Sequence, residues 1–326
     1  MKLSLIIPVY NVEKYIKACL NSVFLQNYSV NDYEVIIVND GTPDNSMVII
    51  DEFSKKYFNI KILNQQNQGL SMARNNGLSI ATGDYVWFID SDDTIKSDSL
   101  ETVCGLIDKY PDVEVFASFM TKVDEFGNRS IENTSKKLQK LCLKGKDYLF
   151  REYPFGASQR FIIKKSFLQK NNLLFKKGIY HEDAEFGIKM LYLSSNVWVL
   201  GESVYNYLVR SSGSIMSSWK KKNSEDLISI YDSLKSFRSS FVKKEDLNMF
   251  NEIMFTLLSC SIYFANNHWK TKDFSDFYKN NKAKIKKEAS QFIIPFKYNI
   301  RLLILRLFYA VSPLYYSKMK LFLKRI

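Results

Sequence analysis

The chain has 326 residues with a net charge of +12, and 46% of the residues are hydrophobic. Six prolines, twelve glycines and no internal repeat exclude a disordered, low-complexity or repeat protein. The four cysteines are scattered among apolar residues without a C-x-x-C pair, which excludes a disulfide framework and a structural zinc site and indicates a reduced, cytosolic protein.

Apolar runs alternate with helical periodicity over the first third of the chain, and no secretory signal is expected before the first run. Strands are predicted over residues 3–9, 33–38, 60–63 and 85–89, with helices after Asn11 (as an N-terminal cap), over 44–57, from the loop 67–75 to near Gly83, and over 97–109. Because strands that alternate with helices are joined by right-handed crossovers, the pattern predicts an α/β fold with a mostly parallel central sheet.

The later elements are less regular. A strand is predicted over 113–119, a hairpin or a loop over 121–145, a helix from His181, short strands over 197–200 and 204–209, and helices over 224–289. We expect three domains: a catalytic domain 1–220, a helical extension 221–290 and a tail 291–326. Within the catalytic domain, residues 1–95 would bind the nucleotide-sugar and residues 96–220 the acceptor.

The tail carries most of the excess positive charge. Residues 282–326 hold eleven Lys and Arg and one acid, Glu288, interleaved with bulky apolar residues. Arg301, Arg306 and Pro313 interrupt the apolar stretches, so a transmembrane helix is not expected. The pattern is typical of a helix that lies on an anionic membrane surface, although a coil packed on the protein's own core or an oligomer contact would also fit.

The strand predicted at 85–89 runs directly into Asp90, Ser91, Asp92 and Asp93. Ligands of parallel α/β sheets bind beyond the carboxyl ends of the strands, so this acidic turn is placed at a ligand site. Carboxylates two residues apart suit a hard divalent cation that also holds phosphate oxygens, although the same residues could simply cap the next helix.

Polar residues also follow the other strands. Tyr10 could stack on a base, Asp40 could accept a hydrogen bond from a base or ribose, and Arg74 could pair with a phosphate. Taken singly, they are better explained as a core tyrosine, a turn aspartate and a surface arginine. Three polar strand ends at one sheet edge make a nucleotide site the better interpretation.

The chain resembles the family 2 glycosyltransferases, which have the GT-A fold. The resemblance rests on six blocks in the family's order and covers about two thirds of the chain: LSLIIPVYN (3–11), EVIIVNDGTPDNS (34–46), NQGLSMARNNGL (67–78), GDYVWFIDSDD (83–93), HEDAEF (181–186) and YNYLVRSSGSI (205–215). Asn39 and Pro43 depart slightly from the pattern without threatening the assignment.

The resemblance implies a role for each matched position. It assigns donor binding to Pro8, Val9, Tyr10, Asp40, Arg74, Asp90, Ser91, Asp92 and Arg210. It implies that Asp92, with Asp90, holds Mg²⁺ or Mn²⁺ at the diphosphate, and that Asp183 is the catalytic base. Glu182 is the competing base, and His181 and Glu182 are weaker candidates for the acceptor side.

The implied activity is inverting transfer of a hexose or N-acetylhexosamine from a UDP-sugar. The acceptor would be a hydroxyl of a lipid-linked oligosaccharide or lipopolysaccharide, and the product β-linked surface polysaccharide made at the inner membrane face. A sugar nucleotidyltransferase is the alternative enzyme, but no Gly-rich triphosphate loop follows the first strand. A nucleic-acid-binding protein is disfavoured because the basic residues lie in an aromatic, leucine-rich tail. The sugar, the linkage position and the oligomeric state stay open.

Overall fold

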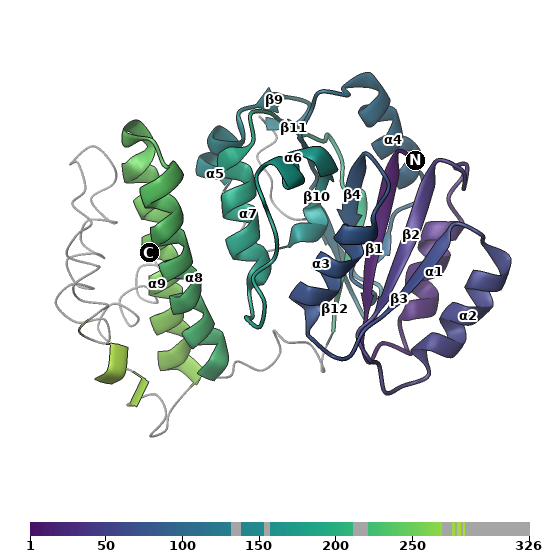
Figure 1. Ribbon diagram of the computed structural model, residues 1–326, viewed down its shortest axis with the longest axis horizontal. Coiled ribbons are helices and arrows are strands. Elements are labelled where there is room, and N and C mark those ends of the chain that lie inside the picture. The colour runs from purple at the N-terminus through teal and green to yellow at the C-terminus, as the bar shows by residue number, and fades with distance from the viewer. Residues whose placement is uncertain are drawn as a thin grey trace. The chain divides into compact units, whose positions relative to one another are not determined.

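The apolar runs that open the chain form neighbouring strands of one sheet in the computed structural model of the protein (Figure 1). The structure describes residues 1–131, 138–152, 157–210 and 221–268, with six positions between 276 and 283. The predicted tail, residues 291–326, lies outside the described residues. By its internal contacts the chain divides into two units, residues 1–178 with 182–213, and residues 179–181 with 214–326. Within the described ranges, no helix has the length and apolar character needed to cross a membrane.

The large sheet of the first unit has, among the described residues, eight strands in the order β3-β2-β1-β4-β10-β6-β11-β9. They are β1 (Leu3–Val9), β2 (Tyr33–Asn39), β3 (Ile60–Asn64), β4 (Tyr85–Phe88), β6 (Val115–Ala117), β9 (Cys142–Leu143), β10 (Phe161–Lys164) and β11 (Val197–Val199). β3, β2, β1 and β4 run parallel, which confirms the predicted arrangement. β10 lies between β4 and β6 and is antiparallel to both, which the alternation of strands and helices does not predict.

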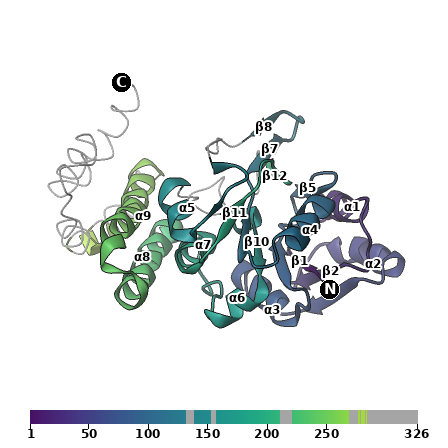
Figure 2. The same ribbon diagram turned by 90° about the horizontal axis from the view of Figure 1, so that it is seen from above.

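Helices cover both faces of this sheet, and Figure 2 shows α1 and α4 on one side and α3 and α6 on the other. Leu5 and Ile7 of β1 belong to the core that includes the buried side chains of α1 and α4. On the opposite face α3 packs so closely that a Cβ at Gly77 would fall 2.5 Å from a side-chain carbon of Ile6. The helices of this unit are α1 (Ile16–Phe24), α2 (Ser46–Lys56), α3 (Leu70–Ile80), α4 (Ser99–Lys109), α5 (Gly145–Glu152), α6 (Lys165–Lys170) and α7 (Glu182–Leu193).

α1 begins at Ile16, later than the sequence pattern predicts. Asn11, the predicted cap, has a φ of 55°, in the left-handed region that asparagine tolerates better than most residues. Its backbone N–H donates a hydrogen bond to Thr42 Oγ1 at 2.8 Å. The cap prediction is therefore wrong, because β1 continues into a loop that is tied to the residues following β2.

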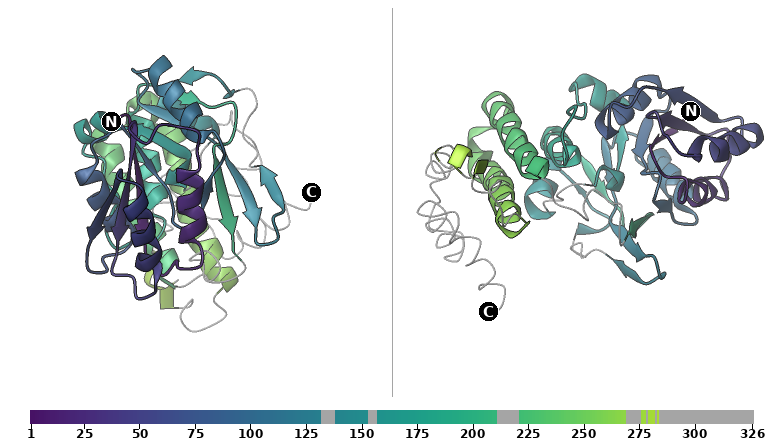
Figure 3. Two further views of the ribbon diagram at one scale, coloured as in Figure 1. Left: turned by 90° about the vertical axis from the view of Figure 1, so that its right-hand side faces the viewer. Right: turned by 90° about the horizontal axis from the view of Figure 1, so that it is seen from below.

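A second, smaller sheet of the first unit has the strand order β5-β12-β7-β8. Its strands are β5 (Thr94–Ile95), β12 (Tyr205–Val209), β7 (Met120–Asp124) and β8 (Arg129–Ile131). β7 and β8 form a hairpin, which is one of the two structures that the sequence allowed and accounts for the first part of the predicted region 121–145. The hairpin projects from the body of the unit (Figure 3). β5 follows the acidic turn directly and pairs with β12, so the small sheet is anchored beside that turn.

The second unit contains the long helices α8 (Lys221–Phe241) and α9 (Leu247–His268), joined by the short 3₁₀ helix η4 (Lys244–Asp246). Leu234 of α8 and Leu257 of α9 are fully buried. The Ser261 hydroxyl donates to the Ser224 carbonyl at 3.0 Å, so the two helices approach closely. The predicted helical region is confirmed as far as residue 268. The predicted domain boundaries remain predictions.

A buried carboxylate ties together the amino-terminal edge of the sheet. Glu34 of β2 accepts hydrogen bonds from Ser4 Oγ (2.6 Å) and from the backbone N–H of Thr82 (2.6 Å), and it pairs with Lys61 Nζ (2.6 Å). Burial alone would raise the pKa of Glu34, but the hydrogen bonds with Lys61, Ser4 and Thr82 outweigh it and lower the pKa to about 2.

We expect Glu34→Gln to lower the free energy of unfolding by about 2 kcal/mol at pH 7. Because the folded-state pKa lies below the ordinary value of 4.5, the stabilisation is complete above pH 4.5 and is lost as the pH falls toward 2. Urea unfolding at pH 7 and pH 3 measures the difference between wild type and variant, which should shrink at the lower pH. Glu52→Gln, at an exposed site on α2, is the control and should change little. If Glu34→Gln lowered the free energy of unfolding equally at pH 7 and pH 3, the role assigned to the Glu34 carboxylate would be contradicted.

Candidate active site

The acidic turn that follows β4 brings three carboxylates together. One carboxylate oxygen from each of Asp90, Asp92 and Asp93 lies within 4.8 Å of the others. A hydrogen bond from the Asp93 N–H to the Asp90 carbonyl (3.0 Å) closes the turn, and Ser91 is buried within it. The side chains of Asp90 and Asp92 are 24% and 20% exposed, so these two can receive a ligand.

Asp93, which the sequence did not single out as a site residue, holds the turn in place. Its carboxylate accepts hydrogen bonds from the Tyr205 hydroxyl and from the Leu208 N–H, both at 2.7 Å. The Tyr205 hydroxyl in turn accepts from the Asp90 N–H at 3.1 Å. Burial raises the pKa of Asp93 well above its usual range, and Asp90 and Asp92 add to this effect. Asp93 therefore fixes the turn to β12 rather than offering a free ligand oxygen.

Removing the Tyr205 hydroxyl tests this anchor. Tyr205→Phe deprives the buried Asp93 carboxylate of one donor and the Asp90 N–H of its acceptor, so we expect the free energy of unfolding to fall by about 2 kcal/mol. Tyr85→Phe is the matched control. Tyr85 lies at the opposite end of β4 from the acidic turn, and its buried hydroxyl donates a hydrogen bond to the Val113 carbonyl. The melting temperature should fall for both variants, but only Tyr205→Phe should also weaken Mn²⁺-dependent binding of UDP, the nucleotide that the sequence leads us to expect at this turn. Unchanged UDP binding in both would show that Tyr205 does not support the acidic turn.

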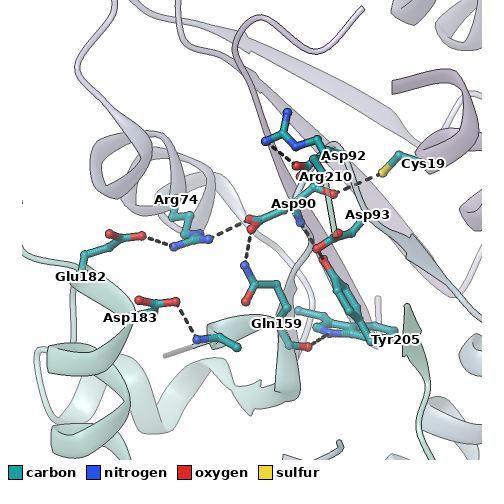
Figure 4. Close-up of polar contacts among 12 residues, drawn as sticks. Cys19, Arg74, Asp90, Asp92, Asp93, Gln159, Glu182, Asp183, Tyr205 and Arg210 are labelled. Carbon is teal, nitrogen blue, oxygen red and sulfur yellow. Dashed lines mark hydrogen bonds and ion pairs between the residues drawn. The ribbon is translucent and has the colours of Figure 1, made fainter. Parts of the chain in front are cut away.

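Two arginines face the exposed carboxylates (Figure 4). Arg210, at the end of β12, pairs with Asp92 through Nη2 and Oδ2 at 2.8 Å, and its guanidinium lies 5.1 Å from the centre of the Tyr15 ring. Burial raises the pKa of Asp92, and Asp90 raises it further, while Arg210 acts in the opposite direction. The pair places a cation beside the carboxylate that the sequence assigns to the metal.

Arg74 is buried instead of exposed on the surface of α3. Its side chain is 1% exposed and pairs with Asp90 Oδ1 at 2.8 Å and with Glu182 Oε1 at 2.7 Å. The guanidinium also lies 5.2 Å from the centre of the Phe175 ring. Arg74 thus joins the acidic turn to the start of α7. Its assignment to a phosphate stays a prediction, and the contacts seen here are those of a residue that bridges two carboxylates.

Asp40 follows β2 and organises the loop that leads into α3. One carboxylate oxygen accepts from Gln65 Nε2 and from the Gln68 N–H, both at 2.7 Å, and the other accepts from the Gly69 N–H at 2.9 Å. Gly69 has a φ of 84°, a conformation that glycine adopts without a steric cost. Asp40 is buried by these contacts, so its predicted bond to a base or ribose remains a prediction.

The end of β1 contributes the remaining donor candidates. Pro8 and Val9 are buried in the sheet, where they pair in register with Val38 and Asn39 of β2. Tyr10 is 49% exposed at the carboxyl end of the strand. Its ring is therefore available for stacking, as the nucleotide interpretation requires.

Glu182 and Asp183 begin α7, and their carboxylates have different hydrogen-bond partners (Figure 4). Glu182 is buried against Arg74, and burial together with the neighbouring Asp183 raises its pKa to about 7, although Arg74 opposes the shift. Asp183 is half-buried, and its Oδ2 accepts a hydrogen bond from the Ala157 N–H at 2.7 Å. Only Asp183 keeps a partly exposed carboxylate, which is what a base acting on a substrate hydroxyl needs.

His181 directly precedes these two acids and belongs to the second unit. Its φ is 61°, and its Nε2 lies 3.4 Å from Asn223 Nδ2 of α8. The adjacent Tyr180 N–H donates to Asp226 Oδ2 of the same helix at 2.7 Å. This contact of His181 is with α8, and its predicted place on the acceptor side stays a prediction.

The residues of the acidic turn fit a divalent cation. Asp90 and Asp92 provide partly exposed carboxylate oxygens close to one another, whereas Asp93 is buried against Tyr205 and Leu208. Three carboxylates so close together repel one another, and a bound cation would relieve that repulsion. The donor set thus suits a metal that prefers oxygen ligands.

A parallel half-sheet whose strand β4 ends in a cluster of aspartates is the arrangement that the sequence resemblance leads one to expect for a nucleotide-sugar-dependent glycosyltransferase of the GT-A fold. The family model of glycosyl transferase family 2 matches residues 4–171, and the chain belongs to this family. EpsH of Bacillus subtilis is 30% identical over 82% of this chain and 77% of its own length.

Two further relatives are named for sugar transfer to poly(ribitol phosphate). The poly(ribitol-phosphate) β-N-acetylglucosaminyltransferase TarS of Staphylococcus aureus is 28% identical over 67% of this chain and 37% of its own length. The crystal structure of residues 1–349 of that protein in complex with UDP-GlcNAc matches with a TM-score of 0.66 at 20% identity, covering 97% of this chain and 89% of that one. The structural match shows a shared fold.

Proposed function

We propose that the protein is an inverting glycosyltransferase that moves a hexose or N-acetylhexosamine from a UDP-sugar to an acceptor hydroxyl, forming a β-linkage. One observation carries the proposal: the acidic turn with Asp90 and Asp92, whose side chains are partly exposed, is bonded through Arg74 to the start of α7, where Asp183 lies. Arg74 pairs with Asp90 and with Glu182, which precedes Asp183 in α7. A donor diphosphate at the acidic turn would therefore lie near a group able to activate the acceptor.

In the proposed reaction Asp183 accepts the proton of the acceptor hydroxyl while that oxygen attacks the anomeric carbon. The new glycosidic bond forms as the bond to the diphosphate breaks, and UDP leaves with the electron pair. A single displacement inverts the configuration, so an α-linked donor gives a β-linked product. Asp92 and Asp90 would hold Mg²⁺ or Mn²⁺, which supplies positive charge for the departing diphosphate. Tyr10 would stack on the base, and Arg210 would stay close to the diphosphate.

For the acceptor we propose a lipid-linked oligosaccharide or lipopolysaccharide at the inner face of the cell membrane. The support is the charge of residues 282–326, in which eleven cations accompany one acid. About 1 kcal/mol for each cation near an anionic leaflet would hold such a segment at the surface. The likeness to TarS favours a second acceptor class, a poly(ribitol phosphate) chain.

A donor screen tests the proposal. Purified protein would be mixed with UDP-glucose, UDP-galactose or their N-acetyl counterparts, with Mn²⁺ or with EDTA, and UDP release would be followed. Metal-dependent release from one donor would support the proposal and identify the sugar. The absence of both UDP release and UDP binding for every donor would overturn the donor assignment. Lipid-linked and poly(ribitol phosphate) acceptors would then be compared with the sugar so identified.

A further inference from the structure

One side chain that contacts Asp90 lies outside every motif in the sequence. Gln159 belongs to a short 3₁₀ helix, η2 (Ser158–Arg160), which leads into β10. Its Nε2 donates a hydrogen bond to Asp90 Oδ2, while Arg74 occupies Asp90 Oδ1. Both oxygens of the Asp90 carboxylate are thus held by donors from separate elements, so the plane of the carboxylate is fixed (Figure 4).

Gln159 can impose this orientation because its own position is rigid. It is 5% exposed, and its backbone carbonyl accepts a hydrogen bond from Trp87 Nε1 at 2.7 Å. Trp87 is fully buried in β4, the strand that carries the acidic turn. The next residue, Arg160, accepts the Ser118 N–H at 2.8 Å through its carbonyl. The amide group therefore extends from a backbone that is bonded to strand β4 and to the end of β6.

The same segment also contacts the second carboxylate of the reaction. Ala157, two residues before Gln159, donates its N–H to Asp183 Oδ2 at 2.7 Å. It does so in the left-handed region, at φ 66° and ψ 70°, which costs an alanine about 1 kcal/mol. Residues 157–159 therefore contact Asp183 through a backbone N–H and Asp90 through a side chain. Loss of the Gln159 amide should disturb Asp90 without moving the Ala157 contact.

We propose that Gln159 is a positioning residue that orients the Asp90 carboxylate toward the donor and its divalent cation. The proposal rests on the glycosyltransferase function proposed above. Hydrogen-bond partners of metal-binding carboxylates fix the direction of the ligand oxygens, and their removal typically weakens metal affinity or activity about 10- to 100-fold. Without Gln159, Asp90 keeps only the Arg74 contact on one oxygen and can turn away from the cation.

The test compares Gln159→Met, which has a similar length and no N–H donor, with Gln26→Met. Gln26 is a matched control because its amide Nε2 donates to the carbonyls of Ser22 and Lys96, and its side chain makes no contact with the acidic turn. Isothermal calorimetry would measure UDP binding across a range of Mn²⁺ concentrations and in EDTA. For Gln159→Met we expect the Mn²⁺ concentration that gives half-maximal UDP binding to rise about 10-fold.

A comparison of Mn²⁺-dependent UDP binding with turnover distinguishes a positioning role of Gln159 from a purely structural one. At saturating Mn²⁺ and donor, turnover of Gln159→Met should recover to within about threefold of wild type, because the base is untouched. Gln159→Asn, which draws the amide back by one methylene, should shift the Mn²⁺ dependence in the same direction. A Mn²⁺ dependence equal to wild type in both variants, with only lower melting temperatures as in Gln26→Met, would overturn the proposal. Wild-type protein that binds no UDP with Mn²⁺ would instead overturn the proposed function, and the role of Gln159 with it.

Discussion

Asp183→Asn is expected to lower glycosyl transfer by about 10²- to 10⁴-fold while UDP binding persists, because the variant removes the proposed base without touching the acidic turn. Asparagine has nearly the same shape as aspartate, and its carbonyl oxygen can still accept the Ala157 N–H that Asp183 accepts at 2.7 Å. The fold of α7 should therefore survive. Initial rates at saturating donor, together with calorimetric UDP binding, separate loss of the base from loss of the donor site.

Glu182→Gln is the informative companion to this variant. Glu182 neighbours Asp183 but is buried and bonded to Arg74, so it should not reach an acceptor hydroxyl. Its amide can still accept one N–H from Arg74, and we expect a smaller loss of transfer than for Asp183→Asn. If Glu182→Gln proved inactive while Asp183→Asn kept its activity, the base would be Glu182 and the assignment made here would be reversed.

Asp92→Ala should abolish the metal dependence of UDP binding and reduce UDP release by about 10²- to 10³-fold. Asp92 provides one of the two partly exposed carboxylates of the turn, and it also pairs with Arg210 at 2.8 Å. The variant therefore removes the proposed metal ligand and the carboxylate that pairs with Arg210. Residual UDP affinity should be the same in Mn²⁺ and in EDTA, which calorimetry can measure directly.

A carboxylate at the other end of the same strand provides the control. Asp84 directly precedes β4 and is exposed. Asp84→Asn should bind UDP with the Mn²⁺ dependence of wild type, because a single charge far along the strand is screened by solvent. A strong Mn²⁺ dependence that survives in Asp92→Ala would show that the cation is held elsewhere.

The parallel half of the sheet could be predicted from the sequence because each strand is an apolar run and each crossover has helical periodicity. The placement of polar residues at the carboxyl ends of β1, β2 and β4 follows from the same rule. β10 could not be predicted, because its pairing with β4 is a contact between distant segments and a run of three apolar residues does not specify a neighbouring strand.

The side-chain contacts within the candidate site could not be predicted from sequence patterns either. Gln159 lies 69 residues from Asp90, Tyr205 lies 112 residues from Asp93, and Glu182 lies 108 residues from Arg74. Nothing local marks a glutamine or a tyrosine as the partner of a remote carboxylate. An arginine near the start of a helix with polar neighbours is expected to be exposed. Only the fold shows that Arg74 is buried between two carboxylates.

The position of β10 between β4 and β6 has a consequence for folding during synthesis. β3, β2, β1 and β4 are complete once residue 88 has been synthesised, but the strand that covers the free edge of β4 ends at Lys164. At a synthesis rate of roughly 5–20 residues per second, β4 stays without its neighbour β10 for about 4–15 s. An unpaired edge of apolar strands is a template for pairing with other chains. We therefore expect the half that holds the candidate nucleotide-binding residues to be prone to aggregation during this interval, and the yield of folded enzyme to depend on chaperones that shield β4.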